Sequence, residues 1–147
     1  MRTEAEWKIY KRAELESVCK KFFAEYGMEI LLNESGEIAP CVYFVQRESG
    51  GPIKIGYSAN IPERIAGLQT EYGKLKVLLI IRGSFRKEKS MHKQFAKYRL
   101  YGEWFEPAPA VLNEIERLKR GEQMDKLVIT DRIFKDVIVK VYRKTRD

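Results

Sequence analysis

Apolar and polar side chains alternate along two short runs in the middle of the chain, Cys41–Gln46 and Ile53–Tyr57. Alternation with a period of two is typical of half-buried strands. The loop at residues 48–52 contains two glycines and a proline, which favour turns, so the two runs predict a β-hairpin. A third aliphatic run, Leu75–Ile81, predicts another strand, which we place at the centre of the sheet.

The two faces of the predicted hairpin carry different residues. Every second side chain of a strand points to the same face. If the isoleucines of the second run pack against Val42 and Phe44 in the core, Tyr43 and Lys54 lie together on the opposite face, away from the core. These two residues form a candidate site, although tyrosine is also a good strand former in its own right.

Apolar residues three and four positions apart predict helices around these strands. Thr3 and Glu6 form a capping box at the start of the first helix, and Gly27 is suited to end it. Asn60 is suited to cap the second helix, with Glu63 three positions later. The predicted helices span residues 3–26, 60–72, 84–100 and 108–120, and Gly121 ends the last of them.

These elements predict the α/β (α+β) class, with a small three-stranded, mainly antiparallel sheet flanked by helices. We expect a domain at residues 40–121, an N-terminal helical segment at residues 1–36 and a C-terminal extension at residues 122–147. Within the extension, residues 126–142 fit a helix, but their β-branched content also fits a strand. The pattern slightly favours the helix.

The helix predicted after Ser84 carries an unusual face. Spacings of three and four place Glu88 and His92 in one stripe with Phe85, Phe95 and Arg99. A carboxylate in an aromatic stripe must be neutralised, paired or bound to a metal, because burying it alone is costly. Glu88 is therefore the best candidate for chemistry. His92 belongs either to the same site or to the edge of the core, bonded to the backbone or to Glu88.

The net charge of +7 is concentrated in one part of the chain. Residues 73–102 hold nine lysines and arginines against one acid, whereas residues 1–39 hold six basic and eight acidic residues. A basic block of this kind is typical of a protein that binds a polyanion, although it also fits a solvated basic face. The candidate nucleic-acid-binding residues are Lys87, Lys89, Lys93, Lys97 and Arg99.

Other features of the sequence exclude several classes of protein. The longest apolar run, Val77–Ile81, is too short to cross a bilayer, and Met1–Tyr10 has mixed charges instead of an apolar signal segment. Cys19 and Cys41 give neither a disulfide framework nor metal-ligand spacing. We therefore expect a soluble cytoplasmic protein with reduced cysteines and no membrane partner.

Five short motifs follow one another at characteristic spacings. They are Val42-Tyr43-Phe44, Lys54-Ile55-Gly56, Arg64, Glu88 with His92, and Gly102-Glu103-Trp104-Phe105. In these motifs the chain resembles the GIY-YIG endonuclease superfamily. More narrowly, it is similar to the phage open-reading-frame branch, in which the second motif begins with lysine.

The resemblance implies metal-dependent hydrolysis of phosphodiester bonds in double-stranded DNA. By this resemblance, Tyr43 takes a proton from the attacking water or orients it. Glu88 holds Mg²⁺ or Mn²⁺ against the scissile phosphate. Arg64 grips the phosphate, since its guanidinium group matches two phosphate oxygens. Lys54 and His92 complete the implied catalytic set.

Two residues depart from the family pattern. Val42 stands at the first glycine, and Lys54 stands at the second tyrosine. Tyr57 does not replace that tyrosine, because an offset of three positions on a strand points to the other face. Lys54 would bind the phosphate, or act as a base if burial favours its neutral form. The departure also leaves open a catalytically inactive domain that only binds nucleic acid.

Overall fold

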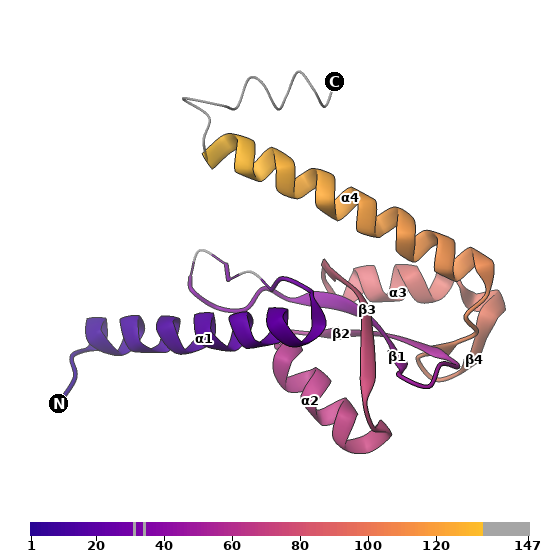
Figure 1. Cartoon of the computed structure of the whole chain (residues 1–147), viewed down its shortest axis with the longest axis horizontal. Coiled ribbons are helices and arrows are strands. Elements are labelled where there is room, and N and C mark those ends of the chain that lie inside the picture. Colours follow the sequence, from indigo (N-terminus) through magenta and orange to yellow (C-terminus); the bar gives the residue numbers. More distant parts are fainter. Residues whose placement is uncertain (31, 34, 134–147) are drawn as a thin grey trace. The chain divides into compact units, whose positions relative to one another are not determined.

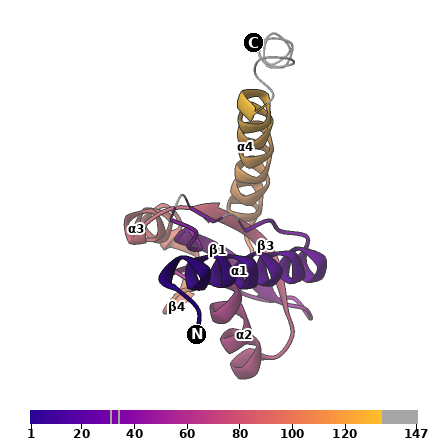
Figure 2. The same ribbon diagram turned by 90° about the vertical axis from the view of Figure 1, so that its left-hand side faces the viewer.

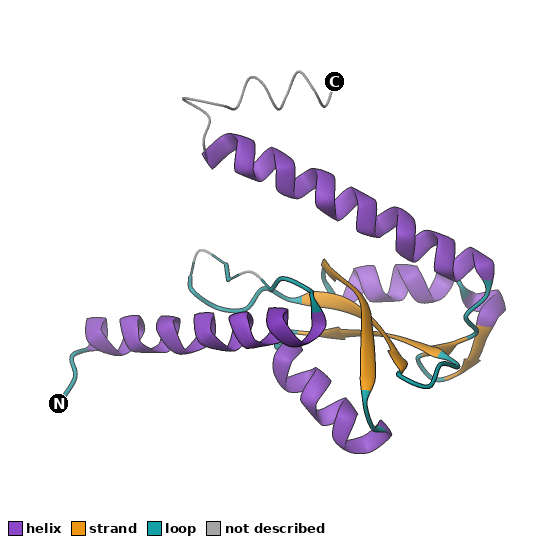
Figure 3. Cartoon of the chain, viewed as in Figure 1, coloured by secondary structure: helices purple, strands orange, loops and turns teal. Residues whose placement is uncertain are grey.

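The predicted hairpin forms the middle of an antiparallel sheet (Figures 1 and 3). The structure is a computed structural model that describes residues 1–30, 32–33 and 35–133, with the backbone alone for residues 122–133. Strands β1 (Cys41–Arg47) and β2 (Ile53–Ser58) pair antiparallel. Strand β3 (Leu75–Arg82) pairs with the other side of β1, also antiparallel.

The sheet is larger than the sequence predicted. Within the described residues it has five strands, in the order β3-β1-β2-β5-β4. The additional strands are β4 (Arg99–Tyr101) and β5 (Trp104–Phe105), and β5 pairs with the free side of β2. The sheet therefore grows beyond β2 and not beyond β3. The three-stranded prediction was wrong in strand number, and the placement of β3 at the centre was wrong because β3 is an edge strand.

Helix α2 (Ile61–Tyr72) covers one face of the sheet. Its start is the predicted one, because Asn60 Oδ1 accepts a hydrogen bond from the Glu63 backbone N–H. Ile61, Ile65 and Leu68 are buried in a cluster that includes Tyr43. Tyr43 therefore lies in the core and not on a face directed away from it, because both faces of the sheet are covered by helices.

Helix α3 (Phe85–Gln94) covers the opposite face, and both views show it across the strands from α2 (Figures 1 and 2). The ring of Phe85 contacts Tyr57, which pairs with Val42 on this face. The helix ends earlier than predicted. Buried Phe95 caps it, and a 3₁₀ turn (Ala96–Tyr98) leads into β4. Arg99 therefore lies on a strand, and the predicted helical stripe stops at Phe95.

Helix α1 (Glu4–Tyr26) has the predicted capping box at Thr3, and Gly27 ends it in the left-handed conformation that favours glycine. Only the C-terminal part of the helix packs on the core, mainly through Phe22, whereas Trp7 and Phe23 are exposed. The helix therefore extends beyond the core that its last turns join.

Helix α4 (Pro109–Ile133) is continuous through Gly121 (Figure 3). The prediction that Gly121 ends the helix was therefore wrong. Glycine inside a helix costs about 1 kcal/mol relative to alanine, which the strong helix formers around it can offset. Of the ambiguous segment at 126–142, residues 126–133 are helical, as favoured, and residues 134–142 lie outside the described residues.

The chain divides into two units, Met1–Ala108 and Pro109–Asp147. All five predicted catalytic residues belong to the first unit. No helix within the described residues is both long and apolar enough to cross a membrane.

Candidate nuclease-like site

Tyr43 and Arg64 are joined across the sheet–helix interface. The Arg64 Nε–H donates a hydrogen bond to the Tyr43 hydroxyl oxygen at 3.2 Å. The well-capped start of α2 fixes the backbone of Arg64 one turn from the cap. Arg64 is otherwise exposed, and it lines a surface hollow of about 530 Å³ together with Ser58 and Asn60. The guanidinium group can therefore hold Tyr43 and still meet a ligand from solvent.

Gly56 makes room for the Tyr43 ring. The two residues are cross-strand partners in β1 and β2. A Cβ atom added at Gly56 would overlap the Cζ and hydroxyl oxygen atoms of Tyr43. The glycine of the second motif is thus required by close packing, which places the tyrosine hydroxyl beside Arg64.

The Tyr43 hydroxyl is protonated at neutral pH. Burial raises the pKa of Tyr43 above its ordinary value of 10.0, while the hydrogen bond and charge of Arg64, and then the charge of Lys54, oppose the rise. Burial thus outweighs the two cations. In this state the group is a neutral hydroxyl that can donate or accept a hydrogen bond.

Lys54 lies on the same face of the sheet as Tyr43, as predicted. In the register of the hairpin, Lys54 pairs with Val45, two positions from Tyr43 on β1. Its Nζ atom lies 3.0 Å from Oε2 of Glu103 and 5.3 Å from the centre of the Trp104 ring. The ammonium group is thus held by a carboxylate and by the face of an aromatic ring.

His92 joins α3 to the edge of β2. Its Nε2 atom lies 2.8 Å from the Ile55 carbonyl oxygen. The Ile55 N–H, on the same side, donates to the Glu103 carbonyl oxygen. His92 therefore lies beside β2 just beyond Trp104, the first residue of the short strand β5. This geometry corresponds to the backbone-bonded alternative for His92 and favours a positioning role for it.

Glu88 is a buried carboxylate without a hydrogen bond among the described residues. It is 6% exposed, and the His92 ring lies nearby, with 4.0 Å between Oε1 and Nε2. Burial, followed by the negative charge of Glu103, raises the pKa of Glu88, and the cations nearby oppose this effect. A buried carboxylate with no close partner is costly in free energy. A cation beside it would remove that cost.

One residue of the described chain, Glu88, could hold a magnesium ion. Mg²⁺ is commonly held by one or two carboxylates and keeps several waters, so a single buried carboxylate near the surface can serve as its protein ligand. Groups of three or more metal-ligating side chains do not occur in the described part of the chain. Glu88 is the residue that would hold the ion.

The predicted catalytic residues lie around strand β2. Tyr43, Lys54 and Arg64 approach it from the α2 face, and Glu88 and His92 approach it from α3. His92 contacts the Ile55 carbonyl group, and Lys54 contacts the Glu103 carboxylate. Ile55 and Glu103 are themselves joined by a backbone hydrogen bond. Strand β2 thus has around it, on its two faces, residues that are up to 49 positions apart in the sequence.

Glu103 and Trp104 are site residues that the sequence analysis missed. Their motif was recognised in the sequence, but neither residue was included in the candidate site. The pairing of β5 with β2 places Trp104 opposite Lys54 and brings the Glu103 carboxylate to its ammonium group. The sequence did offer one signal: an acidic residue, Glu103, and a basic residue, Lys54, both stand within the motifs of the same family pattern.

The predicted nucleic-acid-binding residues lie near this site on α3 and the following turn and strand. Lys89, Lys93, Lys97 and Arg99 are exposed, and Lys87 is half-buried. Lys97 lies in the 3₁₀ turn, and Arg99 donates a hydrogen bond to the Gly102 carbonyl oxygen. The basic residues therefore do not form one helical face, but four of them are available to a ligand.

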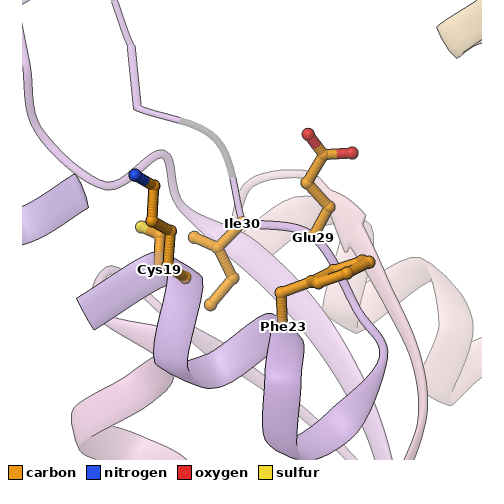
Figure 4. Close-up of a pocket in the computed structure, with 5 residues that line it drawn as sticks. Cys19, Phe23, Glu29 and Ile30 are labelled. Carbon is orange, nitrogen blue, oxygen red and sulfur yellow. The ribbon is translucent and has the colours of Figure 1, made fainter. Parts of the chain in front are cut away.

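A separate hollow of about 470 Å³ lies beside α1 (Figure 4). Cys19 and Phe23 line it from the helix, and Glu29 and Ile30 line it from the following segment. Burial, and secondly the charge of Glu16, raises the pKa of the Cys19 thiol, so the thiol stays protonated. The hollow thus offers no activated nucleophile.

Comparison with known proteins identifies the domain that contains the site. The T5orf172 domain matches residues 40–120, more than half of the chain and all of the predicted catalytic residues. No curated protein and no solved structure matches the chain significantly. The match indicates a phage-related module of nuclease-like or DNA-binding type. The chain belongs to the T5orf172 domain family.

Proposed function

We propose that this chain is a metal-dependent DNA endonuclease of the GIY-YIG type. The observation that carries the proposal is the placement of Tyr43, Arg64 and Glu88 around strand β2, where the charges of Lys54 and Glu103 act on both Tyr43 and Glu88. These residues supply a polar hydroxyl, a cation for phosphate and a buried carboxylate that accepts no hydrogen bond within the described residues. That combination suits hydrolysis of a phosphodiester at a metal ion.

Each residue has a role that follows from its contacts. Arg64 is exposed on one side, and its guanidinium group can donate to phosphate oxygens while Nε remains on Tyr43. The protonated Tyr43 hydroxyl orients the attacking water. His92 holds α3 against β2, and so holds Glu88 in position. A divalent cation held by Glu88 would supply positive charge against the charge that develops on the phosphate.

A DNA-binding domain without catalysis is the second candidate, and one observation favours it. Lys54, which stands at the second tyrosine of the GIY-YIG pattern, is engaged with Glu103 and is 8% exposed. A lysine held in this way is poorly placed to accept a proton from water. The basic residues around the site would support binding in either case.

Plasmid nicking separates the two candidates. Purified protein should convert supercoiled plasmid to the open circular form with Mg²⁺ or Mn²⁺, and a chelator should stop the reaction. The Tyr43→Phe variant serves as the control for contaminating nuclease, since it keeps the ring and removes the hydroxyl. Binding of DNA without nicking under any metal would support the non-catalytic candidate.

DNA binding should depend strongly on salt and on the exposed lysines of the site. Reversing the charge at Lys93 and Lys97 together should lower affinity for all sequences about equally. If both residues contact phosphates, the slope of log affinity against log salt should fall by about two. Fluorescence anisotropy with a labelled duplex measures both quantities.

The matched control is reversal of Lys11 and Lys21, which are exposed on α1 and change the net charge by the same amount. It should leave the salt slope nearly unchanged. Equal losses in the two double variants would mean that net charge, and not a surface near α3, determines affinity.

A further inference from the structure

The ion pair between Lys54 and Glu103 lies within the proposed catalytic site, yet the proposed reaction gives Glu103 no role. Glu103 immediately precedes β5, and its carbonyl oxygen accepts a hydrogen bond from the Ile55 N–H at 3.0 Å. Its carboxylate reaches the Lys54 ammonium group at 3.0 Å. The backbone pairing fixes the carboxylate next to the lysine, so the ion pair is part of the sheet geometry.

The two partners differ in their exposure to solvent. The Lys54 side chain is 9% exposed, whereas the Glu103 side chain is 36% exposed. The ion pair is therefore closed to solvent on the lysine side and partly open on the glutamate side. An anion that binds the Lys54 ammonium group has to compete with this carboxylate.

The charge of Glu103 also acts on the other polar residues of the site. Burial is the main cause of the raised pKa of Tyr43 and of Glu88, the hydrogen bond with Tyr43 is the main cause for Arg64, and the charge of Glu103 adds to the rise in each pKa. The charge of Glu103 thus acts on Arg64 as well as on Lys54. A phosphate and a carboxylate offer these cations the same kind of oxygen acceptor.

We propose that Glu103 occupies the place of a phosphate oxygen on Lys54 and is displaced when a DNA phosphodiester binds. This inference rests on the proposed function and adds a role for Glu103 to it. In the free protein, Glu103 keeps the buried ammonium group paired, which avoids the cost of an isolated buried charge. On binding, the phosphate takes over the pairing, and the carboxylate turns to solvent. Glu103 then lowers DNA affinity while it preserves the geometry of Lys54.

The test is DNA affinity measured in chelator, where no cleavage occurs. Glu103→Gln should bind a short fluorescein-labelled duplex about tenfold more tightly than the wild type, because removing a competing charge next to phosphate is worth about that factor. Glu106→Gln is the matched control. Glu106 lies three positions after Glu103, and its side chain is exposed. Its replacement removes the same charge, so it should change DNA affinity about twofold at most.

A double-mutant cycle with Lys54→Gln identifies the mechanism. If Glu103 competes with DNA for Lys54, the Glu103→Gln substitution should no longer raise affinity above the Glu106→Gln control once Lys54 is replaced. An equal gain with and without Lys54 would contradict the inference, since Glu103 would then repel DNA only through its charge. An affinity of Glu103→Gln at or below that of Glu106→Gln would also contradict it.

A second pair of variants covers the case in which Glu103→Gln does not fold. Glu103→Asp keeps the charge but is one methylene shorter, so its carboxylate cannot hold Lys54 at the same distance. It should bind DNA more tightly than Glu106→Asp, and equal or weaker binding would contradict the inference. If neither the wild type nor any variant binds DNA, the proposed function itself fails. If the wild type binds and the Glu103 and Glu106 variants are alike, only the role of Glu103 fails.

Discussion

Replacing Glu88 with glutamine should reduce plasmid nicking by about a thousandfold or more while DNA binding persists. Glutamine keeps the shape of the side chain but removes the charge that would hold Mg²⁺. DNA affinity should stay the same or rise, because a negative charge has left a basic surface. Nicking and anisotropy assays on the same preparation measure the two effects. Unchanged nicking would remove Glu88 from the mechanism.

The stability of the same variant provides an independent measurement in chelator. Burial and Glu103 raise the pKa of Glu88 above its ordinary value of 4.5, and His92, Lys54 and Lys89 oppose the rise. A raised pKa in the folded state gives stability that is fully present below the unfolded pKa and is lost as the pH rises through the folded one. Glutamine does not titrate. The melting temperature of Glu88→Gln should therefore rise relative to that of the wild type as the pH increases above the ordinary carboxyl pKa of 4.5. A constant difference in melting temperature between the two proteins at every pH would contradict the raised pKa of Glu88.

The second large effect is expected at Gly56. An alanine Cβ at this position would overlap the ring and hydroxyl group of Tyr43, which is fully buried and cannot move aside cheaply. Gly56→Ala should lower the free energy of unfolding by about 3 kcal/mol. The ring would also move away from Arg64, so nicking should fall in the protein that remains folded. Chemical denaturation and plasmid nicking measure the two changes.

Gly67→Ala is the matched control for this substitution. Gly67 lies within α2, and an added Cβ would meet no atom within 4 Å. Alanine is the better helix former, so this variant should gain about 1 kcal/mol. Equal stability of the two variants would show that the contact between Gly56 and Tyr43 is not tight.

Local signals in the sequence predicted much of the fold. Alternation located β1 and β2, and the shared face of Tyr43 and Lys54 followed from their register. Capping residues located the starts of α1 and α2, because Thr3 and Asn60 make the hydrogen bonds that their side chains suggest. These features depend on residues only a few positions apart, which is why a single sequence is sufficient to predict them.

Features that depend on distant residues were not predictable in the same way. The end of α3 is set by Phe95, which enters the core, and by the pairing of β4 with β5, and no helix breaker marks it. The position of Glu103 depends on the pairing of β5 with β2, and α2, β3 and α3 separate these two strands in the sequence. The exposure of Trp7 on α1 was also missed, because a periodic apolar stripe does not show which of its turns meet a core.

The bond between His92 and the Ile55 carbonyl group has a consequence for the tautomer of the imidazole ring. A carbonyl oxygen only accepts hydrogen bonds, so Nε2 must carry the hydrogen that it donates to Ile55. In the neutral ring Nδ1 is then the nitrogen with the lone pair, and only this nitrogen can accept a hydrogen bond or bind a metal ion. Nε2, the nitrogen 4.0 Å from the Glu88 carboxylate, is committed to the backbone of β2 and therefore cannot be a ligand of a cation held by Glu88.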